Sequence, residues 1–307
     1  MTVKITKAVH KIINRNGASL WLPANIVGGR LNLADPDIYA ESTVQLYPLG
    51  TKLEFADGRV FRYGKWGATS TNVPIARMVV NANAAPSCDG YVGDDGFEGN
   101  LYAAATVGDE YVDLWTIIAA SATGYRTTVF AENFFEDGML AVYPSGHYVE
   151  YRICGNEVTT EVSATADYTR VYLDEPLKTA MTVGTAGAYV TTGTLTEASG
   201  GTGVTAYPSI YSQLKDGVAE GSTFTSAMGV CLATGFTSGS FGWIQRRGRC
   251  IITPTAYFGD TANERMAQLH TDGTIALAAA DATHTVGYLT QRTVSGYGDL
   301  EVWLTLE

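Results

Sequence analysis

Six Asp-Gly pairs divide this 307-residue chain into short segments, and they constrain its fold more than any other feature of the sequence. The pairs begin at Asp57, Asp89, Asp95, Asp137, Asp216 and Asp272. Asp-Gly favours tight turns because glycine readily adopts the positive φ angles that such turns require. Turns spread along the whole chain leave little room for long helices and indicate a multi-stranded antiparallel fold.

The clearest local prediction is a β-hairpin around Asp57-Gly58. Leu53 and Phe55 alternate with polar neighbours before this turn, and residues 60–63 (Val-Phe-Arg-Tyr) alternate after it. Such alternation is typical of a strand with one buried face. Further strands are predicted at residues 111–119, 127–130, 139–142, 148–153, 171–173 and 300–306.

The composition agrees with a strand-rich protein. The chain has 34 glycines and 18 tyrosines, and only 17% of its residues are charged, against about 25% in a typical soluble domain. Tyrosine favours pleated, half-buried surfaces, while glycine supplies turns and bulges. We therefore predict an all-β protein, built of small antiparallel β-barrel or sandwich lobes with an extended N-terminal arm.

The predicted division of the chain is an arm over residues 1–45, a first β lobe over 46–185 and a second over 206–307. Residues 179–205 are mostly Thr, Ala, Gly and Val, which fits either a seam between two lobes or a loop within one. In both lobes a short strand after a glycine returns as an apolar strand carrying one cysteine, at residues 138–155 and 242–253. The lobes are therefore either a duplicated small barrel or two instances of a common pattern.

The charge distribution argues against binding to nucleic acid. The net charge is −11 and the isoelectric point is 4.8, so the surface repels phosphate backbones. One basic cluster, Arg246, Arg247 and Arg249, is interpreted as a solvated turn or a subunit contact. The N-terminus has no apolar core of a signal peptide, and the longest uncharged run, residues 221–245, is interrupted by Gly, Ser and Thr. We therefore expect a protein made in the cytoplasm with no membrane partner.

The four cysteines are scattered along the chain, at Cys88, Cys154, Cys231 and Cys250. None forms a C-x-x-C pair or lies at zinc-ligand spacing from a histidine. Buried free thiols are expected for a protein made in a reducing compartment, and a bridge between Cys231 and Cys250 stays compatible with the sequence.

No residue pattern indicates an active site or a metal site. His270 and Asp272 suggest a catalytic dyad, but Asp272-Gly273 is better explained as a turn, and no G-x-S-x-G nucleophile motif occurs. The acidic loop over residues 89–98 lacks the ligand spacing of a calcium site, and residues 200–203 lack the lysine of a phosphate-binding loop. Adjacent acids at 109–110 and 174–175 would point to opposite faces of a strand. We therefore predict no catalytic, cofactor-binding or metal-ligating residue, and no enzymatic activity.

Aromatic residues are the remaining candidates for a binding surface. The five tryptophans, together with the tyrosines, either line a sugar-binding groove or fill the core and a subunit interface. The tryptophans are Trp21, Trp66, Trp115, Trp243 and Trp303.

Three stretches resemble structural proteins of tailed-phage virions. Residues 47–51 (Tyr-Pro-Leu-Gly-Thr) with residues 57–65 (Asp-Gly-Arg-Val-Phe-Arg-Tyr-Gly-Lys) are similar to the opening of such proteins. Residues 241–248, followed by Asp272-Gly273 and residues 286–288, are similar to their C-terminal half, and residues 171–177 also fit. The resemblance runs over residues 47–307, and residues 1–45 lie outside it.

The resemblance implies a head decoration (cement) protein, built on small β-barrels, that stabilises a phage capsid by bridging subunits of the major capsid protein. It also implies a homotrimer on the capsid surface of the virion. An acidic exterior, little reactive chemistry and β edges covered by neighbours all suit this role. The alternative is a receptor- or glycan-binding component of a tail or head fibre.

Overall fold

The protein is all-β in the residues that the structure describes. The computed structural model describes residues 10–15, 17–23, 35–67, 75–81, 92–93, 96–115, 130–143, 148–160, 168–183, 201–216, 226–233, 236–256, 258–261, 263–270, 272–278, 285–291 and 299–307. These residues contain no helix, and so none that could cross a bilayer. The strands pair antiparallel in two sheets, which confirms the predicted fold class.

The chain folds into two compact units, and one of them is discontinuous in sequence. Unit 1 consists of Met1–Ala82 and Tyr211–Glu307, and unit 2 consists of Asn83–Ile210. The chain leaves unit 1 after β5 (Arg77–Asn81) and returns at β13 (Leu214–Asp216), and these strands are antiparallel neighbours with Asn81 opposite Leu214. Unit 2 is thus an insertion whose two ends meet on adjacent strands of unit 1. This division differs from the predicted lobes of 46–185 and 206–307. The prediction gave each lobe one continuous segment, whereas unit 1 is made of two segments separated by unit 2.

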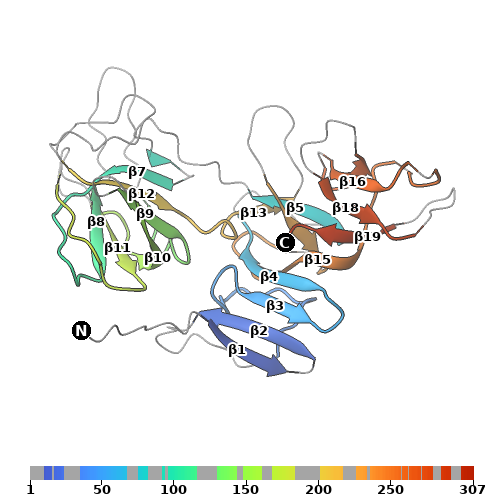
Figure 1. Cartoon of the computed structure of the whole chain (residues 1–307), viewed down its shortest axis with the longest axis horizontal. Helices are drawn as coiled ribbons and strands as arrows, with labels where there is room; N and C mark the ends of the chain where they lie inside the picture. The colour runs from blue at the N-terminus through green and yellow to red at the C-terminus, as the bar shows by residue number, and fades with distance from the viewer. Residues whose placement is uncertain are drawn as a thin grey trace, which may run out of the picture. The chain divides into compact units, whose positions relative to one another are not determined.

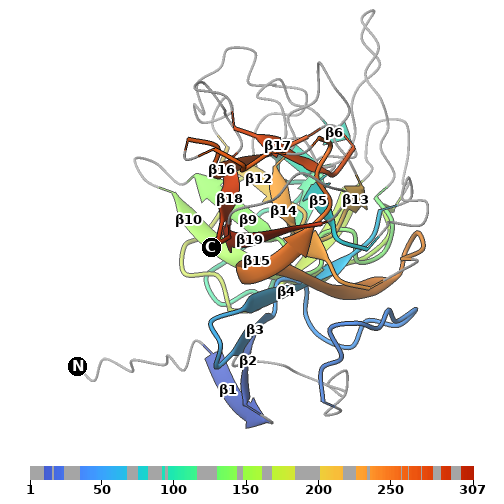
Figure 2. The same cartoon turned by 90° about the vertical axis from the view of Figure 1, so that its right-hand side faces the viewer.

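Unit 1 contains a 12-stranded sheet in the order β1-β2-β3-β4-β15-β19-β18-β16-β17, with β5, β13 and β14 attached beside β15. Figure 1 shows β1 to β4 lying side by side in this order, and Figure 2 shows the same succession leading to β15. The bounds of the strands not given above are β1 His10–Arg15, β2 Ala18–Pro23, β3 Lys52–Phe55, β4 Val60–Lys65, β14 Ala227–Cys231, β15 Phe241–Ile252, β16 Met266–Leu269, β17 Ile275–Leu277, β18 Thr285–Leu289 and β19 Leu300–Thr305.

The predicted hairpin is confirmed as β3 and β4. Glu54 lies opposite Val60, and Gly58 adopts a φ of 86° in the connecting turn. The Asp57 carboxylate accepts a hydrogen bond from the backbone N–H of Arg59 at 3.0 Å. Local turn chemistry therefore explains this element.

The extended arm predicted for residues 1–45 is not what the described part of that segment forms. Residues 10–15 and 18–23 form a hairpin, and β2 pairs with β3, placing Leu20 opposite Leu53. Leu20 and Leu22 are buried in the core that β3 and β4 also cover. The short apolar run of β2 forms a strand because it pairs on one side with β1, across a turn in which Gly17 has a φ of 78°, and on the other side with β3.

Strands β15, β19, β18, β16 and β17 curl into a half-barrel around an apolar core. The curl brings Ile275 of β17 back to the end of β15, where its backbone N–H donates to the Thr253 carbonyl at 3.1 Å. Buried side chains that include Ile252, Val286 and Val302 fill the interior. The alternation predicted for residues 300–306 is confirmed, since Leu300, Val302 and Leu304 are all buried.

Unit 2 contains a seven-stranded sheet in the order β6-β7-β12-β9-β10-β11-β8. The sheet curls around a core that includes Leu114, Tyr151 and Val171, and Leu101 after β7 forms a bridge with Leu114 of β8. The strand bounds are β6 Val92–Gly93, β7 Gly96–Asn100, β8 Tyr111–Trp115, β9 Met139–Tyr143, β10 Val149–Asn156, β11 Tyr168–Leu173 and β12 Gly203–Tyr207. The strands predicted near 111, 139, 148 and 171 are confirmed, whereas residues 116–119 and 127–129 lie outside the described part of the chain.

Candidate functional site

The basic cluster at residues 246–249 is neither a turn nor the start of a returning strand, because it lies within β15. This single strand carries a bulge between Gln245 and Arg247 where it pairs with β4. The correction removes the proposed likeness between the two lobes, since β9 and β10 form a hairpin in unit 2 whereas β15 continues without a break. The sequence Arg-Arg-Gly-Arg resembles a turn because it includes a glycine with φ of 88°, Gly248.

The bulge marks the point where the sheet of unit 1 forks. Before the bulge, Gln245 and Ile244 of β15 pair with β14, and from Arg247 onward β15 pairs with β19. The Gln245 side chain donates to the carbonyls of Arg247 and Arg249, at 3.1 and 2.8 Å. Backbone groups left unpaired by the bulge are thus satisfied by a side chain.

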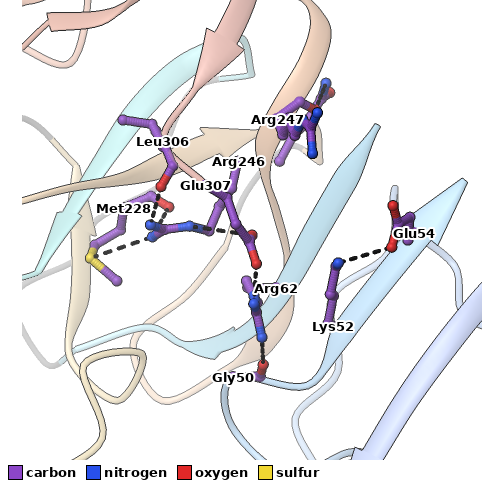
Figure 3. Close-up of polar contacts among 10 residues, drawn as sticks. Gly50, Lys52, Glu54, Arg62, Met228, Arg246, Arg247, Leu306 and Glu307 are labelled. Atoms are coloured by element: carbon purple, nitrogen blue, oxygen red, sulfur yellow. Dashed lines mark hydrogen bonds and ion pairs between the residues drawn. The ribbon is translucent and has the colours of Figure 1, made fainter. Parts of the chain in front are cut away.

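Arg246, the extra residue of the bulge, joins the two branches of this fork. Its guanidinium donates to the Met228 carbonyl of β14 at 2.9 Å and to the Leu306 carbonyl beyond β19 at 2.7 Å (Figure 3). Its Nε lies 3.8 Å from the Glu307 carboxylate, which also forms an ion pair with Arg62. These contacts make Arg246 a structural residue rather than a surface contact.

Arg247 and Arg249, in contrast, are exposed on the outer face of β15. Arg249 donates from Nε to the Glu301 carboxylate at 2.6 Å. No carboxylate in the described part of the chain pairs with Arg247. This end of the half-barrel therefore carries an uncompensated positive charge in a chain whose net charge is −11.

An apolar row crosses the outside of the half-barrel beside these arginines. The strand register places Met266 of β16 opposite Tyr288 of β18, Tyr288 opposite Trp303 of β19, and Trp303 opposite Arg249 of β15. Met266 is 47% exposed, Tyr288 43% and Ile251 56%. We call this surface the half-barrel face; it comprises Arg247, Arg249, Ile251, Met266, Tyr288, Glu301 and Trp303.

A surface of this kind is uncommon on an isolated protein. Exposed apolar residues are normal when scattered singly, but a contiguous group with a polar rim marks an interaction site. The half-barrel face is our candidate functional site. The sequence analysis missed it because its members come from four strands and meet only through the register of the sheet.

The suggested His270–Asp272 pair lies in the tight turn between β16 and β17. The two side chains are 3.2 Å apart, but Asp272 also accepts the backbone N–H of Thr274 at 3.0 Å and contacts Arg77 at 3.2 Å. Partial burial raises the pKa of Asp272, but the hydrogen bonds from Thr274, His270 and Arg77 outweigh it and hold the pKa well below its usual value. The carboxylate stabilises the turn, as the turn interpretation predicted.

The other candidate acids do not converge. Asp109 accepts the backbone N–H of Thr106 at 2.7 Å, and Glu175 forms an ion pair with Lys178 at 2.7 Å. Within the described ranges, no group of three His, Cys, Asp or Glu residues is placed to hold a metal ion. Cys88, His147, His284, Gly200 and half of the acidic loop, including Asp89, Asp94 and Asp95, lie outside those ranges, and so do the side chains of His10 and Glu98.

A pocket of about 290 Å³ lies beside the half-barrel face. It is lined by Gly259, Asp260, Thr261, Glu264, Arg265, Leu289 and Gln291. Glu264 accepts the Gly259 backbone N–H at 2.9 Å, and this hydrogen bond lowers the pKa of its carboxyl. The acid thus holds its own loop in place.

The described cysteines are free thiols in separate environments. Cys231 and Cys250 are buried in different clusters, and burial raises the pKa of each to about 12. Cys154 is exposed, yet partial burial of its sulfur, with Asp174 nearby, raises its pKa to about 11. None has the depressed pKa of a reactive thiolate.

The tryptophans divide between core and surface. Trp66 stacks on Phe236 with centroids 3.9 Å apart, and Trp243 packs on Tyr63 at 5.2 Å, all within the core of unit 1. Trp21, Trp115 and Trp303 are half-buried on the sheets. The core interpretation is confirmed for two of the five.

Comparisons with known proteins found no relative of this chain. No protein-family model matches it, and no curated protein or solved structure is significantly similar to it. Its function must therefore be inferred from its own residues and geometry.

Proposed function

We propose that this chain is a non-enzymatic structural protein of a tailed-phage virion, where it decorates and stabilises the capsid by bridging subunits of the major capsid protein. Its partners are those subunits and further copies of itself in a homotrimer, on the outer surface of the capsid. The half-barrel face is the single observation that best supports this proposal.

The half-barrel face has the composition of a docking surface. Met266, Tyr288 and Trp303 form an apolar row across three strands, and Ile251 is exposed on the same face. Arg247 supplies a positive charge at the margin, whereas Arg249 is paired with Glu301. Aromatic residues, methionine and arginine are the types enriched at protein interfaces. The partner that fits is a protein surface with an apolar centre and an acidic margin.

Two of the three sequence stretches that resemble phage structural proteins lie together in unit 1, whereas residues 171–177 belong to unit 2. Residues 57–65 and 241–248 are about 180 residues apart in sequence, yet β4 and β15 are adjacent strands with Tyr63 opposite Trp243. Tyr47 packs against Tyr63 at 5.2 Å and against Trp243 at 5.3 Å. Because these two distant segments pack together in one unit, we infer that their resemblance reflects a shared folded structure rather than a chance match of short motifs.

The test is the amount of this chain in purified virions, measured by quantitative mass spectrometry against the major capsid protein. A copy number comparable to that of the capsid lattice is the expected result. A copy number restricted to one vertex or to the tail would favour a fibre component instead. Absence from the particle would refute the proposal.

Docking through the half-barrel face has its own test, in which capsids lacking this chain are incubated with the purified protein. We expect Met266→Glu combined with Tyr288→Glu to abolish capsid binding, because it places charge in an apolar interface. Tyr148→Glu is the matched control, since Tyr148 is also exposed but lies in unit 2. Capsid binding that survives the double substitution, in a protein with unchanged thermal unfolding, would show that another surface docks.

A further inference from the structure

Unit 2 presents a second surface, of different chemistry, on the outside of β8 and β11. The antiparallel register places Trp115 opposite Tyr168, Asp113 opposite Arg170, and Tyr111 opposite Tyr172. Paired residues point to the same side of a sheet, and the residues between them, such as Val112 and Val171, are buried in the core. We call this surface the aromatic face; it comprises Tyr102, Tyr111, Asp113, Trp115, Glu157, Tyr168, Arg170 and Tyr172.

The rings of the aromatic face form a partly exposed platform. Tyr111 is 41% exposed and Tyr172 is 39% exposed. At the other end, Tyr102 stacks on Tyr168 with ring centroids 4.7 Å apart and meets Trp115 edge-on at 6.1 Å. These contacts hold the rings in place, so little conformational entropy would be lost when a ligand binds.

Hydrogen-bonding groups lie between the rings and are themselves held in position. Arg170 forms a bidentate pair with Asp113, at 2.8 and 3.0 Å, and its guanidinium lies 4.2 Å from the centroid of the Tyr111 ring. The Tyr172 hydroxyl donates to the Glu157 carboxylate. Arginine has five N–H donors, of which Asp113 uses two, and the exposed Glu157 carboxylate can accept further hydrogen bonds, whereas Asp113 is buried at 8% exposed.

The composition of this face distinguishes among classes of ligand. The outward positions of β8 and β11 alternate aromatic rings with the charged Asp113 and Arg170, whereas the core of a protein interface is depleted in charged side chains. The one arginine is neutralised by Asp113, and Glu157 adds negative charge, so a phosphate-bearing ligand is disfavoured. Flat apolar rings alternating with fixed donors and acceptors match a ligand that itself has apolar C–H faces and many hydroxyl groups.

We propose that the aromatic face is a binding site for a neutral polysaccharide. Tyr111 and Tyr172 stack against the C–H faces of pyranose rings, whose slight positive charge complements the negative face of the aromatic ring. Glu157, which is exposed, accepts hydrogen bonds from sugar hydroxyls, and Arg170 donates to ring and hydroxyl oxygens, while the buried Asp113 holds Arg170 in position. The site lies wholly within unit 2 and does not depend on the function proposed for the half-barrel face.

The test is affinity electrophoresis of the full-length protein through native gels containing one soluble neutral polysaccharide each: dextran, yeast mannan, hydroxyethylcellulose, galactomannan or laminarin. We expect at least one polymer to retard the protein. Replacing both Tyr111 and Tyr172 with alanine should lower the affinity for that polymer about tenfold, because both ring contacts with the sugar are lost. Tyr148→Ala, an exposed tyrosine of unit 2 away from β8 and β11, should leave the mobility shift unchanged.

Two results would overturn the proposal: no retardation in any of the five gels, or equal retardation of the wild-type and double-alanine proteins. If the double variant does not fold, the single variants Tyr111→Leu and Tyr172→Leu replace it, because leucine keeps apolar bulk on the strand but removes the ring. A polymer that retards both leucine variants as strongly as the wild type would likewise refute the site.

Discussion

Replacing Arg246 with methionine should destabilise unit 1 more than the same change at Arg247 or Arg249. The Arg246 guanidinium donates to the carbonyls of Met228 and Leu306, at 2.9 and 2.7 Å, and so joins the two branches of the forked sheet. Its side chain is only 13% exposed. Methionine keeps most of the apolar stem but leaves both carbonyls without their donor.

The expected loss follows from these two hydrogen bonds. A hydrogen bond from a charged donor contributes roughly 1.5–3 kcal/mol to stability. We expect about 3 kcal/mol in total, at the lower end of the combined range, because water can reach the two carbonyls once the guanidinium is gone. In a domain of this size each kcal/mol lowers the melting temperature by about 2–4 °C, so a decrease of roughly 6–12 °C is expected.

Differential scanning calorimetry of the wild type, Arg246→Met and Arg247→Met measures the effect. Arg247 is the matched control, because it is exposed on the same strand and should change stability by less than about 0.5 kcal/mol. Hydrogen exchange should also accelerate in peptides covering β14 and residues 300–307 of the Arg246 variant. Equal melting temperatures for the two variants would refute the assignment of Arg246 to the fork.

Three further predictions concern turns and thiols. Gly248→Ala should lower the free energy of unfolding by about 2–4 kcal/mol, because φ is 88° there and a Cβ would lie 2.9 Å from the Cα of Arg59. Gly239→Ala should lower it by only about 1 kcal/mol, because Gly239 has a similar φ of 79° but a Cβ there would meet no atom within 4 Å. Equal losses in urea titrations of the two variants would contradict the steric argument. The pKa of Asp272 is depressed in the folded state, so the stability that Asp272→Asn removes should be fully present above about pH 5 and should shrink as the pH falls below about 4; a difference independent of pH in thermal melts would refute this. Because burial raises the pKa of Cys231 and Cys250 to about 12, a thiol reagent should label them only after unfolding, and mass spectrometry showing labels on the native protein would contradict their placement.

Local sequence determined those elements whose partners are close in the chain. The β3–β4 hairpin could be predicted because Asp57 and Gly58 supply the turn, and alternating residues supply two strands only a few positions apart. Strands β10 and β19 could also be predicted locally, because alternation of buried and exposed side chains depends only on which face of each strand is buried.

Elements whose partners are distant in the chain could not be found in this way. The Asn16-Gly17 pair could have indicated the local hairpin of β1 and β2, but the pairing of β2 with the distant β3 could not be found from neighbouring residues. The two compact units differ from the predicted lobes for a similar reason, because unit 1 is completed by strands that follow the insertion of residues 83–210. The candidate surfaces depend even more on pairing, since the row from Met266 to Arg249 crosses four strands.

The sequence by itself determined that this is an all-β protein with tight turns, an acidic surface and no recognisable catalytic motif. Those properties follow from residue types and from neighbours a few positions apart, where steric and turn preferences act directly. Only the tertiary structure showed that Arg246 is a largely buried residue that hydrogen-bonds to two strands rather than part of a turn, and that residues 241–252 form one bulged strand. The physical reason is that a glycine with positive φ, here Gly248, suits a turn but also fits a paired strand next to a bulge, and only the strands paired on either side determine which of the two forms.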